Sequence, residues 1–221
     1  MPNWMKMIEA KIALAKRGAK PSRAGDDPRI PPGQKRVHDF PVLDLGLQPE
    51  VSSSSWNMRV FGLVEKELDF SWKTFNVLPQ VDLTADFHCV TRWSQLDMDW
   101  RGVAARELVM RARPLENAGF VTLHSADEYT TNLPLEALLD DDVILAHSVF
   151  GKPLPPEHGG PVRLVVPKRY AWKSAKWLTG IEFHQEDRPG FWEVRGYHNE
   201  ADPWKEERFS HGNLWTEYGG V

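Results

Sequence analysis

Cysteine is nearly absent from this sequence. The chain of 221 residues contains a single one, Cys89, so no disulfide can form within it and no oxidising compartment is needed. A zinc site of clustered cysteines and histidines is also disfavoured, because the eight histidines are dispersed along the chain.

Long apolar runs are absent as well. Charged residues interrupt the first 18 positions, unlike an export signal, and no later stretch is long and apolar enough for a membrane span. We therefore expect a cytoplasmic protein with no membrane span. A formal net charge of -4 argues against a nucleic-acid partner.

Three cofactor signatures are missing too. The chain has no Gly-x-Gly-x-x-Gly turn and no P-loop, which disfavours nicotinamide and ATP chemistry. It has no Cys-x-x-Cys-His motif, which excludes a c-type haem, and we expect no haem.

The order of the apolar patterns predicts an α+β fold with a single domain. Residues 4–17 are apolar at helical spacing, and a tether rich in proline, glycine and charge follows over 20–35. We therefore divide the chain into an N-terminal helix and tether, 1–36, and a catalytic or binding domain, 37–221. Short strands with few short helices between them favour mixed β-sheets over a doubly wound sheet. Further strands are expected at 56–62, 86–90, 120–123, 143–149 and 162–166, and helices at 70–78, 102–110 and 135–139.

Cys89 follows His88 and precedes Arg92 by three positions. A thiol acts as a ligand or nucleophile in its thiolate form, which a nearby positive charge or a metal stabilises. Three interpretations remain open from these residues: a small buried apolar side chain, a metal ligand, or the nucleophile of a Cys-His hydrolase.

The segment 158–177 has five lysines and arginines and no acidic residue, in a chain that is acidic overall. Such a segment favours an anion site, although a solvated basic surface has the same composition. Lys173 and Lys176 are three residues apart and are expected to face one ligand, with Ser174 and backbone amides completing the site. Trp172 and Trp177 within the segment favour a ligand site over a plain surface.

Three segments together resemble the molybdopterin-binding domain of the sulfite oxidase family. They are 88–94 (HCVTRWS), 151–167 (GKPLPPEHGGPVRLVVP) and 170–177 (YAWKSAKW), and the resemblance runs from about Val37 to Arg208. It is strongest to the small branch of that family that carries no cofactor but molybdopterin, which includes the catalytic subunit of a protein-methionine-sulfoxide reductase. The resemblance implies a sulfite oxidase-like fold and molybdenum bound to an unmodified molybdopterin (Mo-MPT).

The resemblance also implies roles for individual residues. Cys89 matches the cysteine that binds molybdenum beside the two dithiolene sulfurs of the pterin, and Arg163 matches an arginine that contacts the pterin. His158 stands where close relatives have an asparagine that serves the cofactor. The other positions that match cofactor-binding residues are His38 and Asp39, Ser125, and the loop Ser174, Ala175 and Lys176.

Substrate-handling residues are expected near the metal. Arg92 is a candidate to bind an anionic substrate, and Trp93 stands where sulfite-oxidising members have a second arginine. Tyr197 and His198 are candidates to donate a proton as oxygen leaves the substrate.

These residues together lead us to expect a molybdenum oxidoreductase. It would transfer an oxygen atom, with two electrons, on a small S-oxide, N-oxide or related oxo compound, and a separate partner would carry the electrons. Two alternatives stay open: a molybdopterin carrier without turnover, and a Cys-His hydrolase.

Overall fold

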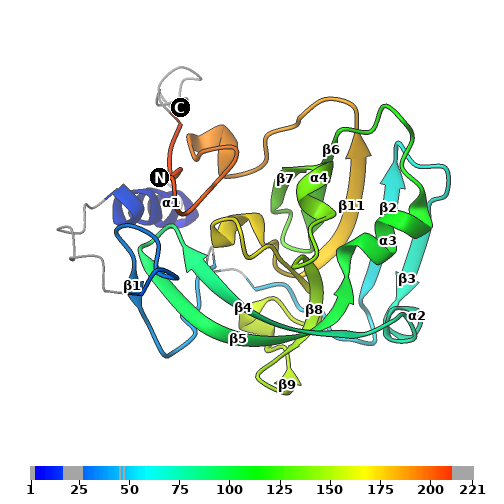
Figure 1. Ribbon diagram of the computed structural model, residues 1–221, viewed down its shortest axis with the longest axis horizontal. Coiled ribbons are helices and arrows are strands. Elements are labelled where there is room, and N and C mark those ends of the chain that lie inside the picture. The colour runs from blue at the N-terminus through cyan, green and yellow to red at the C-terminus, as the bar shows by residue number, and fades with distance from the viewer. Residues whose placement is uncertain (1–2, 17–26, 45, 47, 211–221) are drawn as a thin grey trace.

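Two mixed β-sheets with short helices around them make up the computed structural model, which describes residues 3–16, 27–44, 46 and 48–210 (Figure 1). The six-stranded sheet consists of β1 (Lys35–Arg36), β4 (Val81–Cys89), β5 (Trp93–Ala104), β8 (Ile144–Val149), β9 (Lys152–Pro153) and β10 (Arg163–Val165). The five-stranded sheet has the order β3 (Leu68–Ser71), β2 (Asn57–Gly62), β11 (Leu178–His184), β6 (Phe120–Ser125) and β7 (Thr130–Pro134). Only the β1–β5 and β2–β11 pairs are parallel among these strands.

The helices of the described chain are short, apart from the first. They are α1 (Asn3–Lys16), α2 (Trp72–Asn76), α3 (Ala105–Ala112) and α4 (Leu135–Leu138), and the 3-10 helices η1 (Pro156–His158), η2 (Ala171–Lys173) and η3 (Glu193–Arg195). The α+β class and the single domain expected from the sequence are both confirmed.

The main core lies between the two sheets. Apolar side chains of β2, β6 and β11 from one sheet and of β5, β8 and β10 from the other form one buried cluster with α3. The strands supply these side chains by alternation, as in β2, where Met58 and Val60 are buried and Arg59 is exposed. Because both sheets share this cluster, they form one domain.

The helix expected over 102–110 is α3, which begins three residues later. Its buried residues Ala105, Leu108, Val109 and Ala112 recur at helical spacing. Gly102 and the two residues after it belong instead to β5, because β5 passes so close to β8 there that a side chain on Gly102 would lie 2.0 Å from the carbonyl oxygen of Leu145. The long strand β5 itself and the strand β7 were not expected from the sequence.

The N-terminal segment packs on the domain. Ile8 of α1 is 3% exposed, and Ile12 packs against a cluster that contains Cys89 and Tyr197. Lys35 and Arg36, which end the expected tether and N-terminal unit, pair with Trp93 and Ser94 of β5. The division into 1–36 and 37–221 stays a prediction, and residues 17–26 and 211–221 of it lie outside the described residues.

Within the described residues, no helix combines the length and the apolar character that crossing a membrane requires.

Candidate functional site

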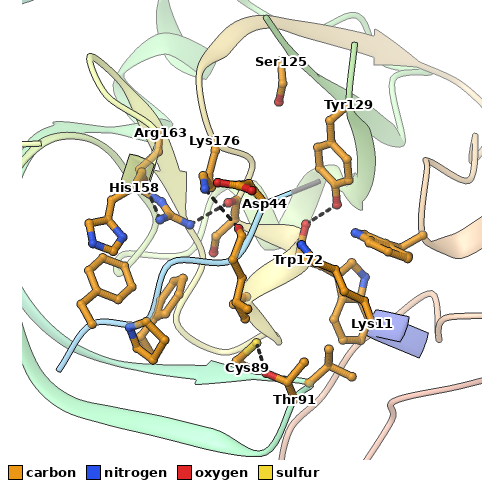
Figure 2. Close-up of a pocket in the computed structure, with 18 of the residues that line it drawn as sticks. Lys11, Asp44, Cys89, Thr91, Ser125, Tyr129, His158, Arg163, Trp172 and Lys176 are labelled. Carbon is orange, nitrogen blue, oxygen red and sulfur yellow. Dashed lines mark hydrogen bonds between the residues drawn. The ribbon is translucent and has the colours of Figure 1, made fainter. Parts of the chain in front are cut away.

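A pocket with a cavity volume of about 140 Å³ opens where β4 ends, beside η1, η2 and α1 (Figure 2). Residues far apart in the sequence line it, from Lys11 to Tyr197. Its wall is mostly apolar and aromatic, with a few charged groups: Lys11, Phe40, Pro41, Leu43, Asp44, Phe87, Cys89, Val90, Thr91, Trp93, Ser125, Asp127, Tyr129, His158, Arg163, Ala171, Trp172, Ser174, Lys176, Trp177, Trp192 and Tyr197.

Cys89 is the last residue of β4 and is buried at the pocket wall. Its Sγ lies 3.2 Å from the hydroxyl of Thr91, and its carbonyl oxygen accepts a hydrogen bond from the amide of Arg92, which closes the turn into β5. Burial raises the pKa of the Cys89 thiol, against the hydrogen bonds with Thr91. The folded chain alone therefore favours the neutral thiol, and a metal bound at Sγ would favour the thiolate.

The histidines near Cys89 have other partners. The Nδ1 atom of His88 lies 2.8 Å from the hydroxyl of Ser94, and its ring meets Trp204 edge-on. Burial lowers the pKa of His88 to about 4. His158 does line the pocket, but its ring stacks on Phe40 with centroids 4.0 Å apart. Within the described part of the chain, then, no histidine is hydrogen-bonded to the thiol as a hydrolase base would be.

Arg163 is a buried cation at the pocket wall. Its guanidinium donates hydrogen bonds to the carbonyl oxygens of His158 and Ser174, both at 2.9 Å, and of Leu164 at 3.3 Å. It also lies over the ring of Phe87, 5.1 Å from the centroid. Burial lowers the pKa of Arg163 to about 9. Within the described residues it has no carboxylate partner, so its charge is available to an anionic ligand.

Lys176 is the second such cation. Its Nζ donates to the carbonyl oxygens of Leu43 at 3.1 Å and Glu157 at 2.6 Å. Burial lowers its pKa to about 8, and Asp44 opposes that shift. Gly159 lets the backbone of Lys176 pack closely against it, because a Cβ on Gly159 would lie 2.9 Å from the Cα of Lys176. Its φ of 100° also favours glycine.

Two serine hydroxyls complete this side of the site, whereas the predicted Ala175 does not line the pocket. Ser174 Oγ accepts a hydrogen bond from the amide of Val166 at 3.0 Å, which fixes the loop after η2 against β10. Ala175 is buried, and its carbonyl oxygen accepts from the amide of Leu164 at 2.8 Å. Ser125 Oγ lines the pocket, is buried, and has no hydrogen-bond partner in the described structure. A buried hydroxyl without a partner indicates a place for a polar ligand atom.

Tyr197 lies in the pocket, but His198 does not line it. The Tyr197 ring is buried against Trp172 and Trp192, and burial raises the pKa of its phenol. The Nδ1 atom of His198 accepts hydrogen bonds from the amides of Glu200 and Ala201 and therefore stabilises its own turn.

Lys173 points away from the pocket, so it does not share a ligand with Lys176 as the three-residue spacing predicts. Its Nζ lies 2.7 Å from Glu193 and donates to the carbonyl and side-chain oxygens of Asn132, both at 2.9 Å. The lysine is 1% exposed and Glu193 3%. The helix η2 ends at Lys173 and the chain leaves helical geometry at Ser174, so Lys176 does not lie on the same helical turn as Lys173.

Three further predicted residues do not line the pocket. His38 and Asp39 are exposed at the surface. The guanidinium of Arg92 lies beside Gly33: a Cβ on that glycine would be 2.8 Å from Nη1 of Arg92 and 3.7 Å from Nη2 of Arg208. Its positive φ of 73° follows from the tight turn after Cys89.

Several residues of the pocket wall were not predicted from the sequence. Tyr129, which hydrogen-bonds the carbonyl oxygen of Trp172 at 2.6 Å, lies between two predicted segments, and Asp127 lies two residues from the predicted Ser125. Lys11 and Asp44 come from the N-terminal segment. Only the amphipathic pattern of 4–17 indicated that this segment packs on anything, and it did not indicate where.

The donor set of the pocket fits an organic anion that carries its own metal ligands. The described residues include no group of three or more histidine, cysteine, aspartate or glutamate side chains placed to hold a metal ion. What the pocket offers is one soft sulfur at Cys89, the buried cations Arg163 and Lys176, and the unpartnered hydroxyl of Ser125. Molybdopterin is such an anion, and thiolate sulfur suits its metal.

Comparisons with known proteins agree with this fit. The chain matches the family described as oxidoreductase molybdopterin binding domain over residues 45–192. It is 45% identical over 183 residues to the uncharacterized oxidoreductase YuiH of Bacillus subtilis strain 168, covering 82% of this chain and 92% of that protein. It is 29% identical over 166 residues to the protein-methionine-sulfoxide reductase catalytic subunit MsrP of Campylobacter jejuni, covering 67% of this chain and 56% of MsrP.

A solved structure shows the same fold. The sulfane dehydrogenase SoxCD of Paracoccus pantotrophus superposes with a TM-score of 0.59 at 24% identity, over 67% of this chain and 42% of that one. The chain thus spans nearly all of the Bacillus relative but only about half of MsrP or SoxCD. The resemblance to the sulfite oxidase family is confirmed: the chain belongs to the oxidoreductase molybdopterin-binding domain family and is a sulfite oxidase-like oxidoreductase.

Proposed function

We propose that the protein uses molybdenum bound to molybdopterin to transfer an oxygen atom, with two electrons, on a small S-oxide, N-oxide or related oxo compound. We assign Cys89 as the protein ligand of the metal. The observation that carries the proposal is the arrangement of one pocket, with the Cys89 sulfur and the two buried cations Arg163 and Lys176 in its wall.

When bound, the molybdenum group supplies the two-electron redox chemistry. The residues of the chain bind it, exclude water and hold protons. Cys89 anchors the metal, and Arg163 and Lys176 stabilise the anionic pterin. The aromatic wall, with Trp172 and Trp192, excludes bulk water from the reacting atoms.

Reduction of an oxo compound consumes two electrons and two protons and releases water. Tyr197 holds one of these protons at its phenol oxygen in the pocket, because a tyrosine is protonated at neutral pH and burial raises the pKa of this one further. Solvent supplies the other proton. The electrons come from a separate electron-transfer partner. That partner, the small oxo substrate and the cytoplasmic location are parts of the same proposal.

The experiment combines metal analysis with turnover. We expect the purified protein to contain about one molybdenum and one pterin per chain. With a reduced viologen dye as the electron donor, it should reduce S-oxides. We expect Cys89→Ser to abolish turnover, because a hydroxyl does not replace the thiolate ligand, while the melting temperature stays close to that of the wild type.

Three results would contradict the proposal in different ways. Retained turnover in Cys89→Ser would exclude the ligand role. Bound cofactor without turnover of any oxo acceptor or donor would favour the carrier. A protein without molybdenum whose native Cys89 reacts with thiol reagents would favour the hydrolase.

A further inference from the structure

Helix α1 forms part of the pocket wall and packs on it through apolar side chains. Ile8 is buried, and Ile12 packs against the cluster that contains Cys89, Trp172 and Tyr197. The side chain of Met7 lies so close to Gly46 that a Cβ there would be 2.6 Å from its terminal methyl carbon. This packing places Lys11, one residue before Ile12, in the pocket wall.

The Lys11 ammonium differs from the other cations of the pocket. The amine and guanidinium of Lys176 and Arg163 donate hydrogen bonds to backbone carbonyls. Lys11 makes no hydrogen bond and no ion pair with any part of the chain that the structure describes. Burial lowers the pKa of Lys11 and the charge of Asp44, in the same pocket wall, opposes that shift. No hydrogen bond or ion pair joins these two residues, so the N–H groups of the half-buried ammonium stay open to an anionic group from outside the chain.

Lys11 also lies at the end of the pocket where the reaction is proposed to occur. Figure 2 shows it toward the end that holds Cys89 and Thr91, with Ser125 at the opposite end. Lys11 is therefore a cation at the Cys89 end of the pocket that donates no hydrogen bond to a backbone carbonyl of the described chain.

The surroundings of Lys11 are apolar. Leu43, Val90, Trp172 and Trp192 line the pocket with it, and they suit the hydrocarbon or aromatic body of a substrate. Lys11 and Leu43 both lie outside residues 45–192, which match the family. This end of the pocket is thus built partly by a segment that the family match does not include.

We infer that Lys11 is a specificity-determining residue that binds a carboxylate or similar anionic group of the substrate, and so selects oxo compounds with an apolar body and a negative charge. The inference rests on the proposed function, since it names the substrate class of that same pocket.

The test compares two S-oxides that differ by one carboxylate group, para-(methylsulfinyl)benzoate and methyl phenyl sulfoxide. Binding of each to the molybdenum-loaded protein is measured by calorimetry, and KM and kcat are measured with reduced viologen. We expect Lys11→Gln to weaken binding of the benzoate and raise its KM about tenfold or more, the loss typical of a charge-assisted hydrogen bond. Methyl phenyl sulfoxide should bind and react as with the wild type.

Lys6→Gln is the matched control, because Lys6 is an exposed lysine on the same helix. It should leave both ligands unaffected. Molybdenum and pterin contents are measured in all variants and should not change.

Every other outcome contradicts either the specificity role of Lys11 or the proposed function. Equal effects of Lys11→Gln on both S-oxides, or failure of the benzoate to bind the wild type, would overturn the specificity role. A fall in cofactor content in Lys11→Gln would mean that the lysine holds the cofactor instead. If the loaded wild type reduces neither S-oxide nor any other oxo compound, the proposed function fails, whereas turnover without charge selectivity overturns only this inference.

Discussion

Arg163 and Lys176 show how a folded chain holds a positive charge inside itself without an ion pair. Their N–H groups donate to backbone carbonyls, which satisfy the hydrogen bonds but carry no net charge. Lys173 is the opposite case, because it is buried beside a carboxylate. The same short segment therefore contains cations that are available to a ligand and one that is neutralised by the protein.

The Lys173–Glu193 pair leads to a stability prediction. Glu193→Gln leaves the buried ammonium without its counter-charge, and we expect it to lower the free energy of unfolding by about 3–5 kcal/mol. Urea unfolding measures the change. Lys173→Met combined with Glu193→Gln should recover part of the loss, since no unpaired charge then remains buried.

The control for this prediction is Glu107→Gln, which removes the carboxylate of a partly exposed pair with Arg111 on α3. We expect a loss below about 1 kcal/mol there. A Glu193→Gln variant no less stable than this control would show that the buried pair does not stabilise the fold.

Among the elements, α1 depends on its contacts with the rest of the domain. A helix of 14 residues is marginally stable alone, so α1 is held in place by the side chains that pack on the domain. Its contacts come from the buried Ile8 and the partly buried Ile12, whereas Leu14 is 46% exposed.

We therefore predict a local effect for Ile8→Ala. Removing a buried isoleucine side chain costs roughly 2–5 kcal/mol in a packed core. Because few side chains dock α1 on the domain, this loss is a large part of the free energy that holds the helix in place. Hydrogen exchange followed by mass spectrometry should show faster exchange in α1 and unchanged exchange in β5 and β8.

Leu14→Ala serves as the comparison, because it shortens an exposed side chain of the same helix, and it should leave the exchange of α1 nearly unchanged. If Ile8→Ala accelerated the exchange of α1 no more than Leu14→Ala, α1 would not be docked through Ile8. Both variants keep good helix formers in the helix.

Elements with a strong local pattern were predictable from the sequence, and those set by distant contacts were not. The apolar spacing of 105–112 predicts α3, but its start depends on the close approach of Gly102 to Leu145, forty-three positions away. In the site, Cys89, Arg163 and Lys176 belong to segments with recognisable motifs. Lys11 and Asp44 do not, because no local pattern indicates over which surface an N-terminal segment will fold.

At the scale of the whole molecule, the pocket joins both ends of the domain. Its lining runs from α1 to the segment after η3 and includes residues of both sheets. A ligand bound there contacts segments that must all be folded, so binding stabilises the native state as a whole.

Removal of the cofactor should therefore lower stability globally. A ligand present at about a thousand times its dissociation constant adds roughly 4 kcal/mol, or about 10 °C in melting temperature for a chain of this length. We expect calorimetry of protein from a host that cannot make molybdopterin to show one transition, lower by about that amount. Two separate transitions, or an unchanged temperature, would contradict the coupling of pocket and fold.

The position of α1 in the chain has a consequence for biosynthesis. A ribosome makes this helix before any of the residues on which it rests, and Tyr197, one of its supports, is among the last of them. The helix has its full set of contacts only after Tyr197 has been made. The wall that contains Lys11 is thus the earliest part of the pocket to be made and one of the last to be assembled.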